Sequence, residues 1–273
     1  MQFEKVKVEV ENAVKAQLSL YIQESYPEMY GERKRPMVLI CPGGGYEHVS
    51  VREGEPIAFA FLTARCHAAV LHYDVAGDGM EHPLPLIELA WAVSYIRGHA
   101  DAYAIDKDKI VVAGFSAGGH LAACLGCFWD KQWLSQKTGM DKNSYKPNGL
   151  ILAYPVITSG EHAHRDSFVR LMGSKASPEL EALLSLEKQV TDQVPPVFMW
   201  HTFEDASVPL ENSMLFAEAL RREGVNFEYH VFPHGRHGLA LATEETTMPD
   251  QNTVEPQCEQ WIQLCKNWLK YNL

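Results

Sequence analysis

The sequence predicts an α/β fold in which a mostly parallel central sheet carries helices on both faces. Apolar runs of about four to eight residues, a length typical of buried strands, recur along the chain and alternate with longer segments of helical periodicity. Such alternation requires crossover connections, which place helices on the two faces of a parallel sheet. The composition shows no break and no internal repeat, so we expect one domain over residues 1–273.

The expected elements follow one another along the chain. The N-terminal segments KVKVEV and QLSLYI are predicted to pair as a hairpin. The other expected strands are PMVLIC (36–41), AAVLHYDV (68–75), KIVVAG (109–114), GLILAYP (149–155), PPVFMWH (195–201) and FEYHVFP (227–233). The expected helices are residues 56–66, 84–100, 117–128, 212–224 and 255–273. Gly224 is typical of a residue that ends a helix.

Two segments interrupt the alternation. Residues 157–193 are mostly polar and contain one capped helix, with Ser177 as its N-cap and Pro178 in its first turn. We expect this segment to form a small cap-like insertion over the functional site. Residues 238–255 have the composition of a long loop, and long loops in a compact domain are commonly functional. We expect this second segment to form the rim of the site or a subunit contact.

Charge and hydropathy limit the classes of partner. The formal net charge is −11, which argues against nucleic acid, because a phosphate backbone requires clustered Lys and Arg. No apolar run approaches the roughly 18 residues of a membrane-spanning helix, so no membrane partner is expected. The N-terminus lacks the apolar region of a signal peptide, which predicts a cytoplasmic protein. A homo-oligomer is possible through residues 238–255 or the N-terminal strands.

The cysteines are predicted to be core residues. The chain has six, and without a secretory signal a disulfide framework is not expected. Cys124 and Cys127 form a C-x-x-C pair, but no second pair accompanies them, and both lie in an apolar helical run. We interpret them as small buried side chains rather than redox or zinc groups.

The stretch VVAGFSAGGH (111–120) contains the strongest functional signal. Ser116 lies between a predicted strand and a predicted helix, and Gly114 and Gly118 flank it in a G-x-S-x-G frame. A serine at such a turn has a strained backbone that exposes its hydroxyl, and small neighbours let the strand and helix approach closely. Ser116 is therefore predicted to be a catalytic nucleophile.

A nucleophilic serine needs a base, and the base needs an orienting acid. In chains with this turn the order is serine, acid, histidine, and Asp205 and His237 each follow a predicted strand downstream. Asp205 has the setting D-x-x-V-P, and a glycine follows His237. The rivals for these roles are Glu204, Asp192, His234 and His201. His162 and His164 provide only two ligands in a polar loop, so no metal site is predicted.

Acyl transfer also needs an oxyanion hole. One donor is expected to be the backbone N–H of Ala117, the residue after the nucleophile. The loop LICPGGGYEH supplies the other, with Gly44 and Gly45 as the candidates, because glycines bring N–H groups into a site without an obstructing side chain. A phosphate-binding loop is disfavoured, because neither G-K-[ST] nor G-x-G-x-x-G is present.

These motifs together resemble the α/β-hydrolase fold, and in particular the small bacterial carbohydrate esterases known as acetyl xylan esterases or related sugar hydrolases. The resemblance extends over most of the chain. The motifs that carry it are PGGGY (42–46), REGEPIA (52–58), YDV (73–75), GFSAGGHLA (114–122), YPVIT (154–158), PPVFMWHTFEDASVP (195–209) and HGLAL (237–241). Pro42 stands where typical lipid esterases have the histidine of H-G-G-G, which separates this chain from them.

The resemblance implies a serine esterase that needs no metal or cofactor and acts through Ser116, Asp205 and His237. The expected substrates are small-molecule or oligosaccharide esters, such as acetylated xylo-oligosaccharides. Aromatic and polar side chains suit sugar faces and hydroxyls, so Tyr46, His48 and Tyr73 are predicted substrate contacts. The polar segment offers further candidates in His162, His164 and Arg165.

Three other functions remain as alternatives. A formamidase or amidase, or a general short-chain carboxylesterase, would use the same three residues. A non-catalytic binding protein is the least favoured, because such proteins usually lack one of the three residues, and all are present here.

Overall fold

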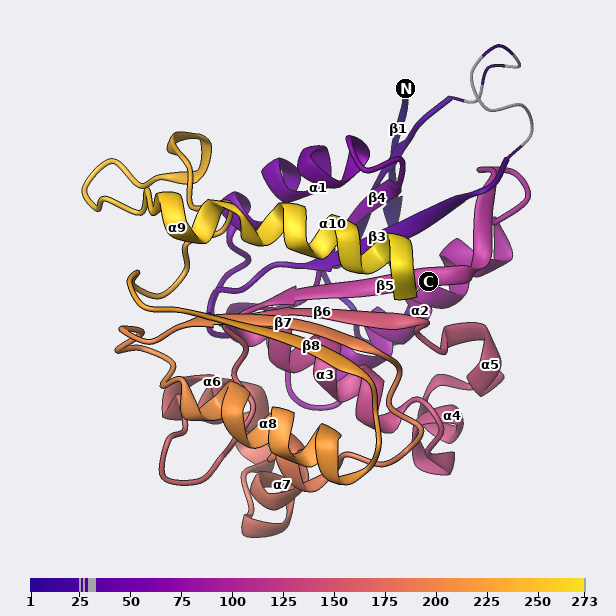
Figure 1. Ribbon diagram of the computed structural model, residues 1–273. Helices are drawn as coiled ribbons and strands as arrows, with labels where there is room; N and C mark the ends of the chain where they lie inside the picture. The colour runs from indigo at the N-terminus through magenta and orange to yellow at the C-terminus, as the bar shows by residue number, and fades with distance from the viewer. Residues whose placement is uncertain (25, 27, 29–32, 273) are drawn as a thin grey trace.

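A twisted eight-stranded sheet forms the centre of the computed structural model, which describes residues 1–24, 26, 28 and 33–272 (Figure 1). The strands are β1 (Gln2–Lys7), β2 (Gln17–Ile22), β3 (Arg35–Cys41), β4 (His67–His72), β5 (Ile105–Phe115), β6 (Gly149–Ala153), β7 (Val197–Thr202) and β8 (Phe227–Phe232). Their order in the sheet is β1-β2-β4-β3-β5-β6-β7-β8.

The sheet is parallel from β4 to β8 and antiparallel at its N-terminal edge. β1 and β2 form the predicted hairpin, and β2 pairs antiparallel with β4. All other neighbours, from β4–β3 to β7–β8, are parallel. The predicted mostly parallel sheet is therefore confirmed. Parallel strands bring their carboxyl ends to one edge of the sheet, which is where sites in such folds are built.

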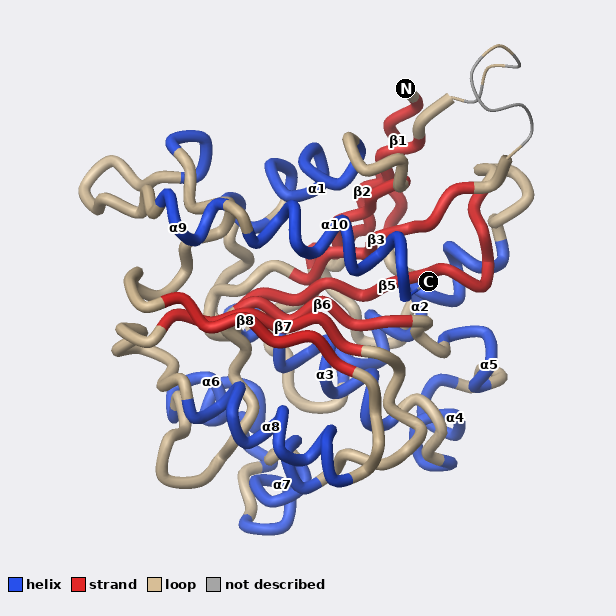
Figure 2. Tube along the Cα trace, viewed as in Figure 1, coloured by secondary structure: helices blue, strands red, loops and turns tan. Residues whose placement is uncertain are grey.

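Helices cover both faces of the sheet, as the sequence predicted (Figure 2). They are α1 (Glu55–Leu62), α2 (Leu84–Gly98), α3 (Ala117–Phe128), α4 (Gln132–Thr138), α5 (Lys142–Tyr145), α6 (Arg165–Met172), α7 (Pro178–Leu183), α8 (Glu211–Arg222), α9 (Pro256–Glu259) and α10 (Trp261–Asn272). Helices α1 and α10 lie on one face, and α2, α3 and α8 lie on the other.

Two apolar clusters hold these layers together, one on each face of the sheet. Strand β5 contributes to both, because successive strand residues point to opposite faces. Its Ile110 and Val112 pack toward α2, α3 and α8, whereas Val111 and Ala113 pack toward α1 and α10. All six cysteines are free and buried, as predicted.

Several expected bounds are corrected. The helix expected over 56–66 ends at Leu62, and the strand expected over 109–114 already begins at Ile105. The first strand covers Gln2–Lys7 rather than KVKVEV, and the strand expected to reach Val75 ends at His72. The C-terminal helix is divided into α9 and α10 around Gln260. The short helices α4, α5 and α6 were not predicted.

The polar segment 157–193 contains α6, α7 and two short 3₁₀ turns. Its predicted helix is α7, in which the Ser177 side chain accepts a hydrogen bond from the N–H of Leu180. Residues 238–255 are mostly loop, with one 3₁₀ turn at Glu244–Thr246. In the described part of the chain, no helix combines the length and the apolar character needed to cross a membrane.

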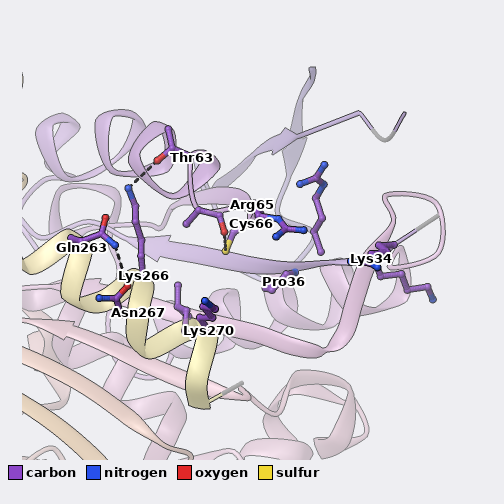
Figure 3. Close-up of a pocket in the computed structure, with 13 residues that line it drawn as sticks. Lys34, Pro36, Thr63, Arg65, Cys66, Gln263, Lys266, Asn267 and Lys270 are labelled. Carbon is purple, nitrogen blue, oxygen red and sulfur yellow. Dashed lines mark hydrogen bonds between the residues drawn. The ribbon is translucent and has the colours of Figure 1, made fainter. Parts of the chain in front are cut away.

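A cavity of about 490 Å³ lies at the amino ends of β3 and β4 (Figure 3). Basic side chains from three parts of the chain surround it, including Lys34, Arg65, Lys266 and Lys270. Ser116, in contrast, follows the carboxyl end of β5. The cavity is therefore at the opposite edge of the sheet from the predicted nucleophile and is separate from the site described next.

Candidate active site

Ser116 lies at a sharp turn between β5 and α3. Its backbone has φ 53° and ψ −118°, a left-handed conformation that a non-glycine residue rarely adopts. The flanking glycines are required by close packing: a Cβ atom added to Gly114 would lie 2.2 Å from the carbonyl oxygen of Gly118. One added to Gly118 would lie 2.1 Å from the carbonyl oxygen of Cys41. The turn therefore has the strained strand-to-helix geometry expected of a nucleophilic serine.

The structure brings Ser116, His237 and Asp205 together in one hydrogen-bonded row. The Oγ of Ser116 is 2.7 Å from Nε2 of His237, and Nδ1 of His237 is 2.6 Å from Oδ2 of Asp205. The three residues follow β5, β8 and β7, whose carboxyl ends meet at the same edge of the sheet. A carboxylate only accepts hydrogen bonds, so Nδ1 donates to Asp205 and Nε2 is left to accept from the serine hydroxyl.

Asp205 is buried and receives four hydrogen bonds. Its Oδ1 accepts from the N–H groups of Ser207 and Val208, at 3.0 and 2.9 Å. Its Oδ2 accepts from His237 and, at 3.2 Å, from Nε2 of His201. Burial alone would raise the pKa of Asp205, but the bonds from His201 and His237 outweigh it and hold that pKa below its ordinary value. The carboxylate therefore stays ionised, as an orienting acid must.

His201, which the sequence offered only as a rival, is a hydrogen-bond partner of Asp205. It is completely buried, and its Nδ1 accepts from Oγ of Ser213 at 2.7 Å. That bond leaves Nε2 protonated, so it donates to both Asp205 and the carbonyl of Val208. The sequence signal that could have identified His201 as a partner of Asp205 is its position at the end of a strand, four residues before Asp205.

The other rivals lie outside this row. Glu204 is exposed, and its carboxylate binds Nδ1 of His234 at 3.0 Å and the N–H of Gly235 at 3.2 Å. Asp192 is exposed and accepts a hydrogen bond from its neighbour Gln193. The Glu204–His234 pair is therefore a separate surface contact.

The glycine loop after β3 lies against the serine. Gly44, Gly45 and Tyr46 all have positive φ, at 121°, 61° and 59°. A Cβ atom on Gly44 would lie 2.0 Å from the carbonyl oxygen of His48, so only glycine fits there. Within the described residues, the N–H groups of Gly44, Gly45 and Ala117 have no acceptor in hydrogen-bonding distance. Their role as oxyanion donors stays a prediction.

The expected substrate contacts Tyr46 and Tyr73 are corrected by the structure. Both side chains are buried, with 1% and 3% of their surface exposed. The Tyr46 hydroxyl pairs with Nδ1 of His120 at 3.0 Å, and the Tyr73 hydroxyl donates to the carbonyl of Pro42 at 2.7 Å. The two hydroxyl groups therefore bind protein groups, and the Tyr73 bond holds the glycine loop at Pro42. His48 is exposed, and its contact with substrate stays a prediction.

Helix α6 of the polar segment faces the glycine loop. A Cβ atom on Gly45 would lie 3.4 Å from Nη1 of Arg170, 3.8 Å from Oγ of Ser167 and 3.9 Å from Cε1 of His164. Arg170 is held by Glu47 at 3.0 Å, and His164 by Ser167 at 2.9 Å. This wall of the site is polar and hydrogen-bonding in character.

The other two polar candidates have structural contacts. Arg165 donates to the carbonyls of Ser159 and Gly160, and it pairs with Glu181. His162 is half-exposed and lies 3.9 Å from Glu211. Of the three polar candidates, only His164 lies beside the glycine loop.

The sheet order, the strained serine turn and the histidine after the last strand define an α/β-hydrolase fold. The sequence model of the BD-FAE family matches residues 24–220. The chain therefore belongs to the BD-FAE family.

Similar proteins add detail to this assignment. The chain is 42% identical over 214 residues to "Endo-1,4-beta-xylanase B" of Butyrivibrio fibrisolvens, covering 78% of this chain and 34% of that protein. It is 26% identical over 208 residues to "Acetylxylan esterase" of Xylanibacter ruminicola, covering 74% of this chain and 40% of that protein. This chain thus spans well under half the length of these two relatives.

A solved structure matches over nearly the whole chain. The acetyl ester-xyloside bifunctional hydrolase from Caldicellulosiruptor lactoaceticus is 37% identical, with a TM-score of 0.80. The match covers 94% of this chain and 88% of that one.

Proposed function

We propose that this protein is a serine esterase that removes short acyl groups, above all acetyl, from xylo-oligosaccharides or related sugars. The observation that carries the proposal is the unbroken row Ser116–His237–Asp205, with donor distances of 2.7 and 2.6 Å. The names of an acetylxylan esterase and an acetyl ester-xyloside hydrolase among the similar proteins support the acyl and sugar classes.

In the first step, Ser116 Oγ attacks the acyl carbonyl while His237 Nε2 takes the hydroxyl proton. A bond forms between Oγ and the acyl carbon, and the carbonyl oxygen becomes an oxyanion. The N–H groups of Ala117 and of Gly44 or Gly45 would bind that oxygen. Asp205 holds the imidazole and stabilises its cationic form. The bond to the sugar oxygen then breaks, and that oxygen receives the proton from His237.

In the second step, water replaces the sugar. His237 takes a proton from the water as its oxygen attacks the acyl carbon, which gives a second oxyanion in the same place. The bond to Ser116 Oγ then breaks, Oγ regains a proton from His237, and the carboxylic acid leaves. The cycle needs no redox partner, because no atom changes oxidation state.

The polar wall beside the glycine loop supports a sugar as the alcohol part of the substrate ester. Ser167 and Arg170 of α6, and His164 just before it, approach Gly45, which places donors and acceptors next to the expected oxyanion site. A long acyl chain would need an apolar surface there instead. This arrangement favours a small acyl group with a hydroxyl-rich leaving group.

The test is a matched substrate panel assayed with the wild type and Ser116→Ala. The panel contains p-nitrophenyl acetate, butyrate and octanoate, an acetylated xylo-oligosaccharide and N-formylkynurenine. We expect acetate release from the sugar and the p-nitrophenyl ester, with rates that fall as the acyl chain lengthens. Removing the nucleophile should lower kcat by about 10⁶ while leaving the circular dichroism spectrum unchanged.

Other outcomes would redirect the proposal. Serine-dependent activity confined to the formamide would identify an amidase, and a preference for octanoate would identify a general carboxylesterase. Substantial turnover by Ser116→Ala would contradict the nucleophile assignment itself.

A further inference from the structure

The REGEPIA segment has a role that the serine, acid and histidine do not explain. It begins in η1 (Val51–Glu53), a 3₁₀ turn that connects the glycine loop to α1. Within this turn Val51 is exposed, whereas Glu53 retains only 3% of its surface. A buried carboxylate is costly unless it is hydrogen-bonded, so the contacts of Glu53 indicate why it is there.

The first oxygen of Glu53 holds the glycine loop. Its Oε2 accepts a hydrogen bond from the N–H of Gly43 at 2.8 Å. A Cβ atom added to Gly43 would lie 2.7 Å from that oxygen and 2.9 Å from Cβ of Ser116. The carboxylate thus binds the loop at Gly43, the residue that packs against Ser116 and directly precedes Gly44.

The second oxygen reaches the histidine loop through a tyrosine. Oε1 of Glu53 accepts from the Tyr154 hydroxyl at 2.7 Å, and that hydroxyl accepts from the N–H of Ala240 at 2.9 Å. The Tyr154 ring also packs edge-on against the imidazole of His237, with centroids 5.1 Å apart. The same carboxylate therefore supports both sides of the nucleophile.

Arg52, the preceding residue, binds the histidine loop directly. Its Nη2 donates to the carbonyl of Gly238 at 3.0 Å, and its Nη1 donates to the carbonyl of Thr246 at 2.8 Å. Gly238 immediately follows His237 in the chain. Two adjacent side chains of one turn thus hold the two loops that flank the serine.

Both of these loops are strained. Non-glycine residues adopt a positive φ in each of them, Tyr46 in one loop and Ala240 and Ala242 in the other. Residues in such conformations persist only where their surroundings fix them. Catalysis in turn requires oxyanion donors and base to be held within about 0.5 Å of the productive geometry.

We propose that Arg52 and Glu53 are positioning residues. They fix the distance between the glycine loop and the His237 loop, which lie on either side of Ser116. The inference rests on the proposed esterase function. Neither side chain is assigned a contact with substrate. Their effect is on the transition state, because they set where the oxyanion donors and the imidazole lie relative to the reacting carbon.

The first test is Glu53→Gln, which keeps the shape of the side chain. An amide NH₂ cannot accept a hydrogen bond, so one of the bonds from Gly43 and Tyr154 must be lost. We expect kcat for p-nitrophenyl acetate to fall about tenfold to a hundredfold, with KM within threefold of wild type. Affinity for a small boronic acid, whose tetrahedral adduct occupies the oxyanion site, should fall by the same factor as kcat.

Two variants separate positioning from general destabilisation. Val51→Ala changes an exposed side chain in the same turn, and Glu88→Gln changes a buried glutamate in α2 that contacts the N–H of Asp74. Both should keep kcat within twofold of wild type. The melting temperature of each variant is measured so that catalytic and stability losses are compared directly.

Tyr154→Phe keeps the proposal testable if Glu53→Gln does not fold. This change retains the ring against His237 but removes the hydroxyl between Glu53 and Ala240. We expect about a tenfold loss of kcat. Arg52→Lys should give a smaller loss in the same direction, because one ammonium group replaces a two-pronged contact with Gly238 and Thr246.

The proposal is overturned if Glu53→Gln, or Tyr154→Phe in its place, retains kcat within threefold. It is also overturned if kcat falls without loss of boronic acid affinity, or if Glu88→Gln loses as much kcat at an equal drop in melting temperature. Absence of Ser116-dependent turnover in the wild type would instead contradict the proposed function, and boronic acid affinity would then be undetectable in every variant.

Discussion

Asp205 and Glu204 are adjacent carboxylates in opposite environments. Asp205 has 6% of its surface exposed and accepts hydrogen bonds from two backbone N–H groups and two imidazoles. Glu204 is exposed and pairs with His234 at the surface. Only the buried carboxylate can hold one tautomer of His237 without competition from water.

Replacing each carboxylate with its amide is expected to affect kcat very differently at the two positions. Asp205→Asn should lower kcat by about 10⁴, because the amide favours the wrong tautomer of His237. Glu204→Gln should change kcat less than threefold, since it removes only a solvent-exposed pair. Steady-state kinetics with p-nitrophenyl acetate measures both, and a larger loss in Glu204→Gln would show that the acid has been misassigned.

For single residues, the sequence predicts those whose role follows from their order along the chain. The sequence selected the three residues that the structure brings together. The signals were a serine between two glycines, and then an aspartate and a histidine that each follow a strand. His201 was missed as a partner of Asp205, because a strand-end histidine carries no sign of which group it faces. Tyr46 and Tyr73 were misplaced because composition does not report that their hydroxyl groups have partners inside the protein, His120 for Tyr46 and the carbonyl of Pro42 for Tyr73.

Helix α3 is the element that fixes Ser116, the proposed nucleophile. It begins at Ala117, directly after Ser116, and every residue from Ala117 to Phe128 is buried. Its first turn lies against β3, since a Cβ atom on Gly118 would be 2.1 Å from the carbonyl of Cys41 and 2.4 Å from that of Pro42. The position of the helix relative to the glycine loop is therefore set by backbone contact.

Two glycine substitutions in α3 should have different consequences. Gly118→Ala forces a methyl group into backbone atoms and is expected to lower the free energy of unfolding by about 3 kcal/mol and to abolish activity. Gly126→Ala meets Cδ1 of Leu150 at 2.5 Å, a flexible side chain that can move, and alanine favours the helix. Its net effect on stability should stay within about 1 kcal/mol.

Urea denaturation and ester hydrolysis measure both effects. Equal destabilisation by the two substitutions would show that α3 can shift away from β3 and that the contact with Cys41 does not fix it.

Elements with strong periodicity were predicted more accurately than short ones. The strand QLSLYI and the helix at Ala117–Phe128 match the structure at both ends. Helices α4 and α5 were missed because a helix of seven or four residues offers too few turns for a pattern to emerge. The break between α9 and α10 was missed because apolar spacing continues across it.

The molecule as a whole has a formal net charge of −11, and one of its carboxyl groups lies in the core. Glu88 in α2 is fully buried. Its Oε2 accepts from the N–H of Asp74, whose own carboxylate holds the N–H groups of Val14 and Lys15 after the N-terminal strand. The described residues provide no partner for Oε1 of Glu88. This group therefore couples the packing of α2 and the N-terminal hairpin to pH.

Burial, together with the nearby charge of Asp74, raises the pKa of Glu88 from 4.5 to about 8. The folded protein therefore binds this proton at pH values where the unfolded chain releases it. Stability from Glu88 is full below about pH 4.5 and is lost as the pH rises toward 8.

The expected loss is about 1.4 kcal/mol per pH unit within that window, as an upper limit. Glu88→Gln removes the titration while keeping the shape of the side chain, so its free energy of unfolding should change less between pH 5 and pH 8. Urea denaturation of both proteins at pH 5, 6, 7 and 8 measures the difference. Parallel pH profiles for wild type and variant would show that Glu88 is ionised in the folded protein and that the buried site is more polar than its contacts indicate.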